Sequence, residues 1–486
     1  MRKIHFIYII LALLCCASAC KPGKAEPAGA QPGIYPDYAG VTVPCNIAPL
    51  RFTLSSDCSA QYAVFSAGDC NVGVGGKKEV AISAGKWRKL LKAAEGSEIG
   101  VTIYAKQGGS WKEYEPFKIY VSADKIDPYV AYRLIEPGYE IWSEMGIYQR
   151  NLENFKESTI LFNNQTDYGC MNCHSFCKQD PDQMLFHLRV GYNGTYVIRD
   201  GEIEKLNTKT PETISALVYP QWHPTGKYVA FSVNSTKQMF HTSDLNRVEV
   251  FDYTSDVVVY DVEKHEITSC PELKAFGRFE TFPTFAPDGK SIYFCSADSL
   301  SMPENYEKVK YSLCRIGFDP ETRSFGSQVD TLVNAREIDK SVSFPRVSPD
   351  GKHLMFTLAQ YGNFSIWHND SDLYMLDLES GECRSIDEIN SDWVDSYHCW
   401  SSDGRWVVFS SRRLDHLYTR LFIAHIDSEG NAGKAFALPQ KHVGFYGQFM
   451  KSYNIPEFIS GKVELNARKF HLFARDDKGI DLTYSE

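Results

Sequence analysis

The sequence predicts an all-β protein in which a small N-terminal β-sandwich is followed by a β-propeller of five or six blades. Two observations predict this fold. A pattern of strand, glycine turn and strand recurs four times in the C-terminal half, and short alternating strands fill the segment before it. The helical pattern is confined to one short candidate, GKWRKLLKAAE, at residues 85–95. At 486 residues the chain exceeds one ordinary hydrophobic core, so we expect more than one domain.

Residues 1–20 have the pattern of a bacterial lipoprotein signal peptide. Arg2 and Lys3 precede an apolar run too short for a stable membrane span, and Ala17-Ser18-Ala19-Cys20 resembles a lipobox, in which the cysteine is acylated. Ordinary cleavage without a lipid is the alternative. Residues 21–36 are rich in Pro, Gly and Ala and are expected to form a tether. We therefore expect an exported protein, lipid-anchored to a membrane through Cys20 in the bacterial cell envelope, in the outer membrane and facing the periplasm or the cell surface.

The segment after the tether alternates between apolar and polar residues in short runs. RFTLSS, YAVFSA, EVAIS, IGVTIYAK and FKIYVSA each read as a strand, so residues 37–125 are expected to form an Ig-like β-sandwich. Residues 126–168 are rich in aromatic side chains and contain Pro128 and Pro137. We expect them to form a packed connector, because aromatic side chains bury area against their neighbours.

Four later segments carry the repeat that defines the second domain. They are YPQWHPTGKYVAFS, FPTFAPDGKSIYFCS, FPRVSPDGKHLMFT and YHCWSSDGRWVVFSS, and their turn glycines, Gly226, Gly289, Gly351 and Gly404, are 63, 62 and 53 residues apart. Stretches such as VVVYDVEKHEI supply a third strand and a turn into a fourth. Four antiparallel strands at this period are typical of a propeller blade. We assign residues 169–486 to the propeller, with residues 421–486 closing or wrapping it.

These segments resemble the TolB-type, WD40-like (PD40) propeller repeat, whose core reads P-x-W-S-P-D-G-K-x-I-x-F-x-S. A fifth, partial copy appears when Pro181-Asp182 is set against Pro287-Asp288. The whole chain, with RLIEPGYEIW, CMNCHSFC and YNIPEF, is similar to a Bacteroidetes-type family of TolB-like β-propeller lipoproteins that carry a CxxCH motif and are often labelled cytochrome c biosynthesis proteins. The resemblance implies the propeller, export and haem attachment, and it establishes no activity.

Cys170, Cys173 and His174 form the sequence C-M-N-C-H, the spacing of a covalent c-type haem site. Each thiol would add across one haem vinyl group, and His174 would be the axial iron ligand. One alternative is a structural zinc site in which Cys177 joins these three residues, although all four ligands would then come from eight positions. Disulfides or unused thiols are the other alternative. The motif predicts one covalent haem c.

The sixth iron ligand would decide between electron transfer and ligand binding. His398 is the first candidate, because it occupies the slot held by Pro220, Pro283 and Pro345 in the other repeats and is expected near the face of His174. The other candidates for the sixth ligand are Met184 and His187, and the alignment sets His187 against Ala230 and Tyr293. His223 ranks lower because we expect it toward the opposite face.

Two arginines are candidates for binding the haem propionates. Arg412 and Arg413 leave a second strand toward the face expected for His174, where a guanidinium could pair with a carboxylate. For the arginines the ordinary alternative is a solvated charge pair. For the candidate histidines and Met184 it is packing or hydrogen bonding within the sheet.

The remaining cysteines give a weaker signal. Of the 14 cysteines, Cys45, Cys58 and Cys70 lie in one early segment and could supply one disulfide, while Cys295 and Cys399 are expected to be buried thiols. The spacing alone leaves the connectivity open.

Composition and motifs exclude several classes of function. The net charge is −10 and no stretch is densely basic, which argues against nucleic acid as a partner. The sequence contains no G-x-S-x-G, HExxH or P-loop motif. The preferred interpretation is a membrane-anchored c-type cytochrome that transfers single electrons to a redox partner of unknown identity. We expect an electron carrier or a binding protein rather than an enzyme.

The alternative interpretation is a binding or scaffold lipoprotein. Its propeller would recognise an envelope protein, a peptide or a glycan, and any haem or metal would be structural only. Five aromatic residues would then form a platform at the channel: Tyr219, Trp222, Phe344, Tyr397 and Trp400.

Overall fold

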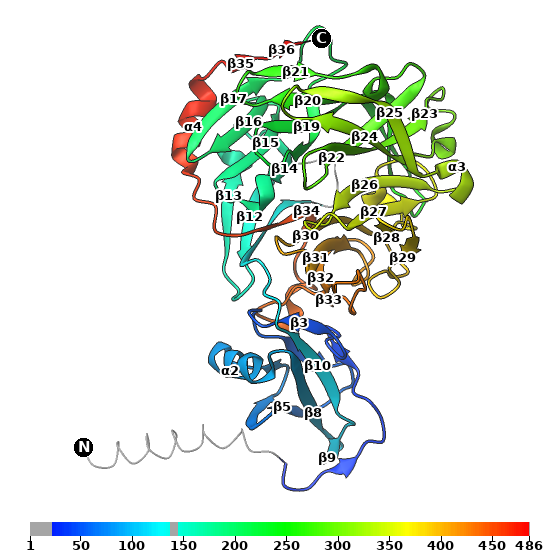
Figure 1. The fold of residues 1–486 in the computed structure, drawn as a ribbon. Coiled ribbons are helices and arrows are strands. Elements are labelled where there is room, and N and C mark those ends of the chain that lie inside the picture. The colour runs from blue at the N-terminus through cyan, green and yellow to red at the C-terminus, as the bar shows by residue number, and fades with distance from the viewer. Residues whose placement is uncertain (1–21, 137–143, 486) are drawn as a thin grey trace, which may run out of the picture. The chain divides into compact units, whose positions relative to one another are not determined.

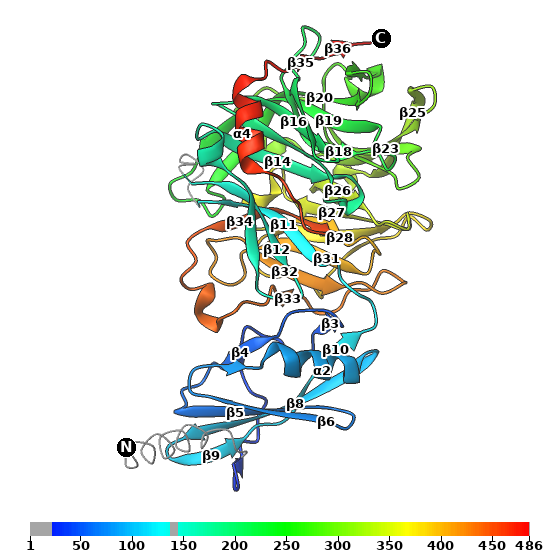
Figure 2. The same ribbon diagram turned by 90° about the vertical axis from the view of Figure 1, so that its left-hand side faces the viewer.

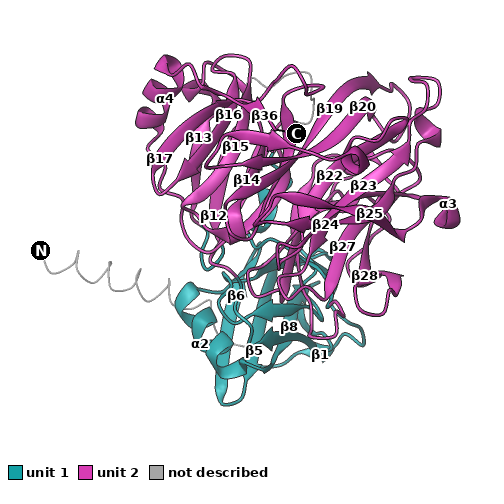
Figure 3. Ribbon diagram, turned by 45° about the horizontal axis from the view of Figure 1, so that its top comes forward, with its two compact units in different colours: residues 1–126, 152–155, 433–449 teal, residues 127–151, 156–432, 450–486 magenta. Residues whose placement is uncertain are grey.

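The computed structural model describes residues 22–136 and 144–485 (Figure 1). The predicted signal peptide and lipid-bearing Cys20 lie outside the described residues, as does part of RLIEPGYEIW. The chain divides into two compact units, coloured separately in Figure 3. Unit 1 comprises residues 1–126, 152–155 and 433–449, and unit 2 comprises residues 127–151, 156–432 and 450–486. No helix among the described residues is long and apolar enough to cross a membrane.

In its described residues, unit 1 contains two sheets and one α-helix. The larger sheet has the order β1-β9-β8-β10-β3, with β5 and β6 continuing from β8, and the smaller has the order β2-β4-β7. The elements are β1 (Glu26–Pro27), β2 (Ile34–Tyr35), β3 (Thr42–Pro44), β4 (Arg51–Leu54), β5 (Ala60–Ala67), β6 (Cys70–Gly76), β7 (Val80–Ala81), α2 (Ala84–Ala94), β8 (Ser97–Gln107), β9 (Ser110–Glu113), β10 (Phe117–Ser122) and β33 (Phe436–Ala437). The segment expected to be a tether contributes β1 and β2, so part of it is tied to the sheets.

Helix α2 forms where the helical pattern predicted it. Trp87, Leu90, Leu91 and Ala94 recur at helical spacing and are all buried, which fixes the apolar face against the larger sheet. The Trp87 indole donates a hydrogen bond to the Ile47 carbonyl at 3.0 Å. Cys45, Cys58 and Cys70, which the sequence offered as a source of one disulfide, are free thiols.

Unit 2 is a six-bladed β-propeller, which confirms the predicted fold class at the larger of the two predicted blade numbers. The strands of each blade are given from the channel outward. Blades one and two are β34 (Ser452–Ile459), β11 (Tyr129–Ile135), β12 (Gly146–Asn151) and β13 (Glu157–Phe162), and β14 (Cys170–Phe176), β15 (Gln183–Arg189), β16 (Gly194–Arg199) and β17 (Glu202–Asn207); blades three and four are β18 (Leu217–Trp222), β19 (Tyr228–Phe240), β20 (Val248–Asp261) and β21 (Glu266–Thr268), and β22 (Arg278–Phe285), β23 (Ser291–Asp298), β24 (Ser312–Asp319) and β25 (Ser324–Val333). Blades five and six are β26 (Ser341–Val347), β27 (His353–Ala359), β28 (Asp372–Asp377) and β29 (Cys383–Ser385), and β30 (Asp395–Trp400), β31 (Trp406–Ser411) and β32 (Arg420–His425). We number them one to six in this order.

The inner strands form a closed ring. Strand β14 contacts β18, and the contacts continue through β22, β26, β30 and β34 back to β14. Strand β34 comes from the C-terminal part of the chain and pairs antiparallel with β11, from Tyr129 opposite Ile459 to Ile135 opposite Ser452. The two ends of the propeller chain are therefore joined within blade one. Closure of this kind leaves no exposed edge at the start or end of the ring.

Residues 126–168 differ from the expected connector, because they supply β11, β12 and β13, three of the four strands of blade one. They lack the glycine-turn pattern of the other repeats, since the inner strand of their blade lies about 300 residues later in the sequence. The predicted aromatic packing is present: the Tyr132 and Tyr453 rings, from β11 and β34, lie 4.8 Å apart.

The residues after β34 wrap the outside of two blades. Helix α4 (Ala467–Asp476), red in Figure 2, packs Phe470 against Phe186 and Tyr196 of blade two, at ring distances of 5.5 and 4.9 Å. Strand β35 (Ile480–Asp481) then pairs with β17, and β36 (Thr483–Tyr484) pairs with β21. The C-terminal segment thus both closes the propeller and wraps it, the two outcomes that the sequence left open.

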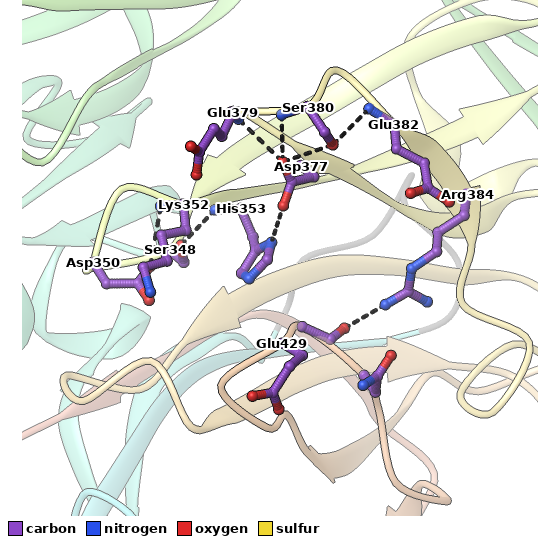
Figure 4. Close-up of polar contacts among 12 residues, drawn as sticks. Ser348, Asp350, Lys352, His353, Asp377, Glu379, Ser380, Glu382, Arg384 and Glu429 are labelled. Carbon is purple, nitrogen blue, oxygen red and sulfur yellow. Dashed lines mark hydrogen bonds and ion pairs between the residues drawn. The ribbon is translucent and has the colours of Figure 1, made fainter.

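Two of the repeated glycine turns share one local pattern of hydrogen bonds, which Figure 4 shows for blade five. In blade five, Ser348 Oγ donates to Asp350 at 2.6 Å and accepts from the His353 amide at 3.0 Å, while Asp350 accepts from the Lys352 amide at 3.1 Å. Gly351 has φ +74°, a value that favours glycine. Ser401, Asp403 and Trp406 repeat this pattern in blade six. The S-P-D-G-K and S-S-D-G-R sequences are therefore the determinants of these two turns.

Candidate functional site

Each inner strand of the propeller is interrupted by one residue in the left-handed region. These six residues are Cys173, Tyr219, Phe282, Phe344, Tyr397 and Ile455, with φ between 47° and 55°. Each lies at a break in register with the second strand of its blade. Such a conformation is uncommon for residues other than glycine, and here it recurs once in every blade. We call the six residues the channel plug.

Contacts between blades show that the plug side chains meet within the channel. The Tyr219 and Phe282 rings lie 4.4 Å apart, Phe282 and Phe344 lie 5.8 Å apart, and Phe344 and Tyr397 lie 4.7 Å apart. Neighbouring members of this chain come from neighbouring blades, so the rings pack around the axis. The Cys173 thiol is close enough to raise the pKa of the Tyr219 and Tyr397 phenols, although burial is the largest cause of both shifts. Cys173 therefore completes the plug beside these two tyrosines.

A cavity of about 460 Å³ opens on one side of the plug. Its wall is formed by the residues two positions beyond the plug in five inner strands: Gln221, Thr284, Arg346, Cys399 and Glu457. Its rim is formed by the next residues, Phe176, Trp222, Phe285, Val347, Trp400 and Phe458. We call this cavity the funnel. All of its lining residues belong to unit 2.

The funnel wall holds one cation and one carboxyl group. Burial lowers the pKa of Arg346 only to about 10, so its guanidinium is charged at neutral pH. Burial raises the pKa of Glu457 to about 8, against the opposing effect of Arg346, so this carboxyl is mostly neutral at pH 7. Glu457 Oε2 accepts a hydrogen bond from the Phe176 amide at 3.0 Å. At neutral pH the wall therefore carries net positive charge.

Two tryptophans are fixed in the funnel by bonds between blades. Trp222 Nε1 donates to the Ser175 carbonyl at 3.3 Å, and Trp400 Nε1 donates to the Arg346 carbonyl at 3.1 Å. Of the predicted aromatic platform, Trp222 and Trp400 line the funnel, whereas Tyr219, Phe344 and Tyr397 belong to the plug. The platform is thus divided between two levels of the channel.

The C-M-N-C-H residues lie on β14, the inner strand of blade two. Cys170 is partly exposed at the start of the strand, opposite Arg189, and Cys173 belongs to the plug. His174 is 2% exposed, and burial lowers its pKa to about 3 against the opposing effect of a contact with the Ile455 backbone. Its imidazole is therefore neutral and buried at physiological pH.

The alternative zinc site is not formed in the structure. Cys177 lies beyond β14 in the turn, where its thiol contacts the His223 carbonyl at 3.7 Å. Within residues 22–136 and 144–485, no group of three or more His, Cys, Asp or Glu side chains could hold a metal ion.

His398 occupies the slot predicted for it, and the structure places His174 in the same slot of another blade. Both residues follow the plug residue of their strand, in the slot that holds proline in the other four blades. His398 Nε2 bonds to the Met355 carbonyl at 2.9 Å, and burial lowers its pKa to about 3. His398 therefore contacts blade five, whereas His174 belongs to blade two.

His187 and Met184 also make contacts within the fold. His187 Nδ1 bonds to Thr195 Oγ1 at 2.8 Å, and Met184 is buried in an apolar cluster. The predicted alignment of His187 is wrong by two residues, because Leu185 is the residue that matches Ala230 and Tyr293 in register. The turn in blade two is one residue longer than in blade three, and Lys178 and Gln179 take the positive φ values there in place of a glycine.

The lower-ranked His223 and the two arginines have partners within the propeller. His223 lies in the glycine turn, where Nε2 bonds to the Gly289 carbonyl at 3.1 Å. The Arg412 guanidinium lies 3.8 Å from the centre of the Trp367 ring. Arg413 forms an ion pair with buried Asp395 at 2.6 Å. Both arginines thus have partners from blades five and six.

Sequence reasoning missed Arg346, Glu457 and Gln221 as site residues. A usable signal was present, because the position two beyond the plug reads Q, T, R, C and E in YPQ, FPT, FPR, YHC and IPE. Polar residues in this column of an otherwise apolar repeat mark the channel wall.

Comparisons with known proteins give no family for this chain. No protein-family model and no curated protein match it. Among solved structures, the tricorn protease is 10% identical with a TM-score of 0.33 over 71% of this chain and 33% of its own. A prolyl endopeptidase is 12% identical with a TM-score of 0.33 over 64% and 42%. A DUF4784 family protein from Bacteroides caccae is 8% identical with a TM-score of 0.30 over 76% and 97%. The chain thus spans less than half the length of the two peptidases.

Proposed function

We propose that this protein is a binding protein whose propeller takes a ligand into the funnel. The observation that carries this proposal is the cavity of about 460 Å³, with polar side chains in its wall and aromatic side chains at its rim. Ligand sites are typically concave, largely apolar and equipped with a few polar groups that fix orientation. The alternative of a scaffold that recognises a peptide or glycan is therefore the function that the geometry supports best.

Filling the funnel is expected to abolish ligand binding. Thr284 lies in the wall, so Thr284→Tyr places a phenol in the cavity, and Gln221→Trp fills it from another blade. Calorimetric titration of short peptides and acidic oligosaccharides should show binding to the wild type and a loss of at least about tenfold in both variants. Thr322→Tyr, in an exposed turn of blade four, is the matched control. Equal binding by all four proteins would show that the ligand site lies elsewhere.

The second candidate function is haem binding and one-electron transfer to an unknown redox partner. Cys170 and Cys173 would form two thioether bonds, each thiol adding across one vinyl group, and His174 would be the axial ligand. The supporting observation is that His174 is neutral and buried, next in the chain to a thiol of the channel plug. Because His174 is 2% exposed, its packing would have to open for haem to attach.

A pyridine haemochrome spectrum tests this second function. The protein would be exported from a host with a cytochrome c maturation system, with the Cys170→Ala/Cys173→Ala double variant as control. A c-type band that survives denaturation, and is absent from the double variant, is the expected result. Protein without covalent haem under these conditions would eliminate the redox function and leave the binding function intact.

A further inference from the structure

The geometry points to a carboxylate as the ligand group that the funnel recognises, held by the guanidinium of Arg346. This inference rests on the proposed binding function and names the chemistry of its ligand. It concerns the cation at the wall of the cavity rather than the C-M-N-C-H residues.

The contacts of Arg346 do not include a carboxylate that would pair with its positive charge. One nitrogen, Nη1, donates to the Pro345 carbonyl at 2.7 Å, and the guanidinium lies 4.0 Å from the centre of the Phe344 ring. These contacts hold the planar group in place. Among the described side chains, no carboxylate forms an ion pair with Arg346, and its cavity is open to solvent. A guanidinium has five N–H donors, so donors remain for a planar anion.

The rest of the funnel matches a carboxylate-bearing ligand with an apolar or amide body. Gln221 and Thr284 offer neutral hydrogen-bonding groups in the wall, and Lys178 adds a second cation among the lining residues. Trp222, Trp400 and Phe285 provide apolar surface at the rim. Arginine recognises carboxylates through two parallel hydrogen bonds, which gives direction as well as attraction. The C-terminus of a peptide and the uronic acid of a glycan both present this group.

Glu457 is expected to make binding depend on pH. The charged and titratable groups that face it are Arg346 and Cys399 in the wall and Lys178 among the lining residues. Below about pH 8 Glu457 is neutral and Arg346 is free to bind an anion. Above that pH the Glu457 carboxylate competes for the guanidinium. Affinity for the ligand should therefore fall between pH 7 and pH 9, and Glu457→Gln should remove most of this decrease.

The test compares free and blocked carboxylates in calorimetric titrations at pH 7. One arm uses a tetrapeptide mixture with free C-termini against the same mixture amidated, and the other uses glucuronate disaccharides against their methyl esters. We expect one free-acid probe to bind, and the arm in which it does so identifies the source of the carboxylate. Blocking the acid, or Arg346→Gln in the protein, should weaken binding roughly 10- to 100-fold.

The control variant is Arg315→Gln, which removes the same charge from a partly exposed ion pair with Asp330 on the outer strands of blade four. It should bind as the wild type does. Equal affinity for free and blocked probes overturns the carboxylate assignment, as does an absence of binding by both free acids. If blocked probes bind wild-type protein as tightly as the free acids do, and Thr284→Tyr binds neither, the assignment fails and the binding function stands. If Thr284→Tyr binds every probe as the wild type does, the binding function fails as well.

Discussion

A chain that ends at residue 449 is expected to lose the folded propeller. The truncation removes β34, the inner strand of blade one, which pairs with β11 and contacts β30 and β14. Loss of this strand exposes the edge of β11 and the apolar surfaces that Phe458 and Ile459 cover in the full chain. Domain stabilities are typically about 5–15 kcal/mol, so the loss of one whole inner strand exceeds what the fold can absorb. Near-ultraviolet circular dichroism and thermal unfolding measure the effect.

A chain that ends at residue 465 is the matched control. It keeps β34 and removes only α4, β35 and β36. The ring should remain folded, with a free energy of unfolding lower by about 3–5 kcal/mol, because Phe470 no longer covers Phe186 and Tyr196. A cooperative unfolding transition in the chain that ends at residue 449, with a melting temperature like that of the full chain, would contradict closure by β34.

The substitution Asp252→Ala is expected to destabilise the propeller by about 3–5 kcal/mol. Asp252 is buried on β20 of blade three and accepts hydrogen bonds from three side chains: Asn234 at 2.8 Å, Tyr311 at 2.8 Å and Asn363 at 2.7 Å. The last two belong to the neighbouring blades four and five. Alanine would leave these donors without their acceptor in a site that water does not reach. Urea unfolding of the two proteins measures the difference.

Asp330→Ala is the control for this substitution. Asp330 also accepts from a side chain, at 2.7 Å from Arg315, but it is 40% exposed. Exposed ion pairs contribute less than about 1 kcal/mol, so this variant should unfold almost as the wild type does. Equal destabilisation by the two alanine substitutions would show that the bonds from Tyr311 and Asn363 to Asp252 do not join the blades as described.

The sequence predicted the propeller because four of its blades carry a local signal. The glycine turns and the alternating strands around Gly226, Gly289, Gly351 and Gly404 are each complete within about 15 residues. Blade one has no such signal, since β34 and β11 are joined only by the closing of the ring. Blade two was partly recognised, but its longer turn shifted the alignment of His187. Local sequence patterns therefore predict a blade, whereas the pairing of strands that are far apart in the sequence is seen only in the three-dimensional structure.

The candidate site was predicted less completely than the fold. The spacing of Cys170, Cys173 and His174 is visible in sequence, and the haem that it predicts stays a prediction. The funnel depends on a feature that spacing does not reveal, because the bulge at each plug residue turns the strand and sets the next polar residue in the wall. Arg346 and Glu457 are 111 positions apart and share a cavity only through the symmetry of the ring.

The most direct test of ligand binding in the funnel is protection of Cys399 from alkylation. Cys399 lies in the funnel wall, while Cys383 is exposed on β29 and serves as an internal reference. Mass spectrometry would follow the modification of both thiols by a maleimide, with and without a saturating concentration of the free-acid probe that binds. The account predicts that the probe slows modification of Cys399 about tenfold or more and leaves Cys383 unchanged. If Cys399 is modified in the absence of probe, and is modified at the same rate at saturating probe, the bound ligand lies outside the funnel and the proposed function is contradicted.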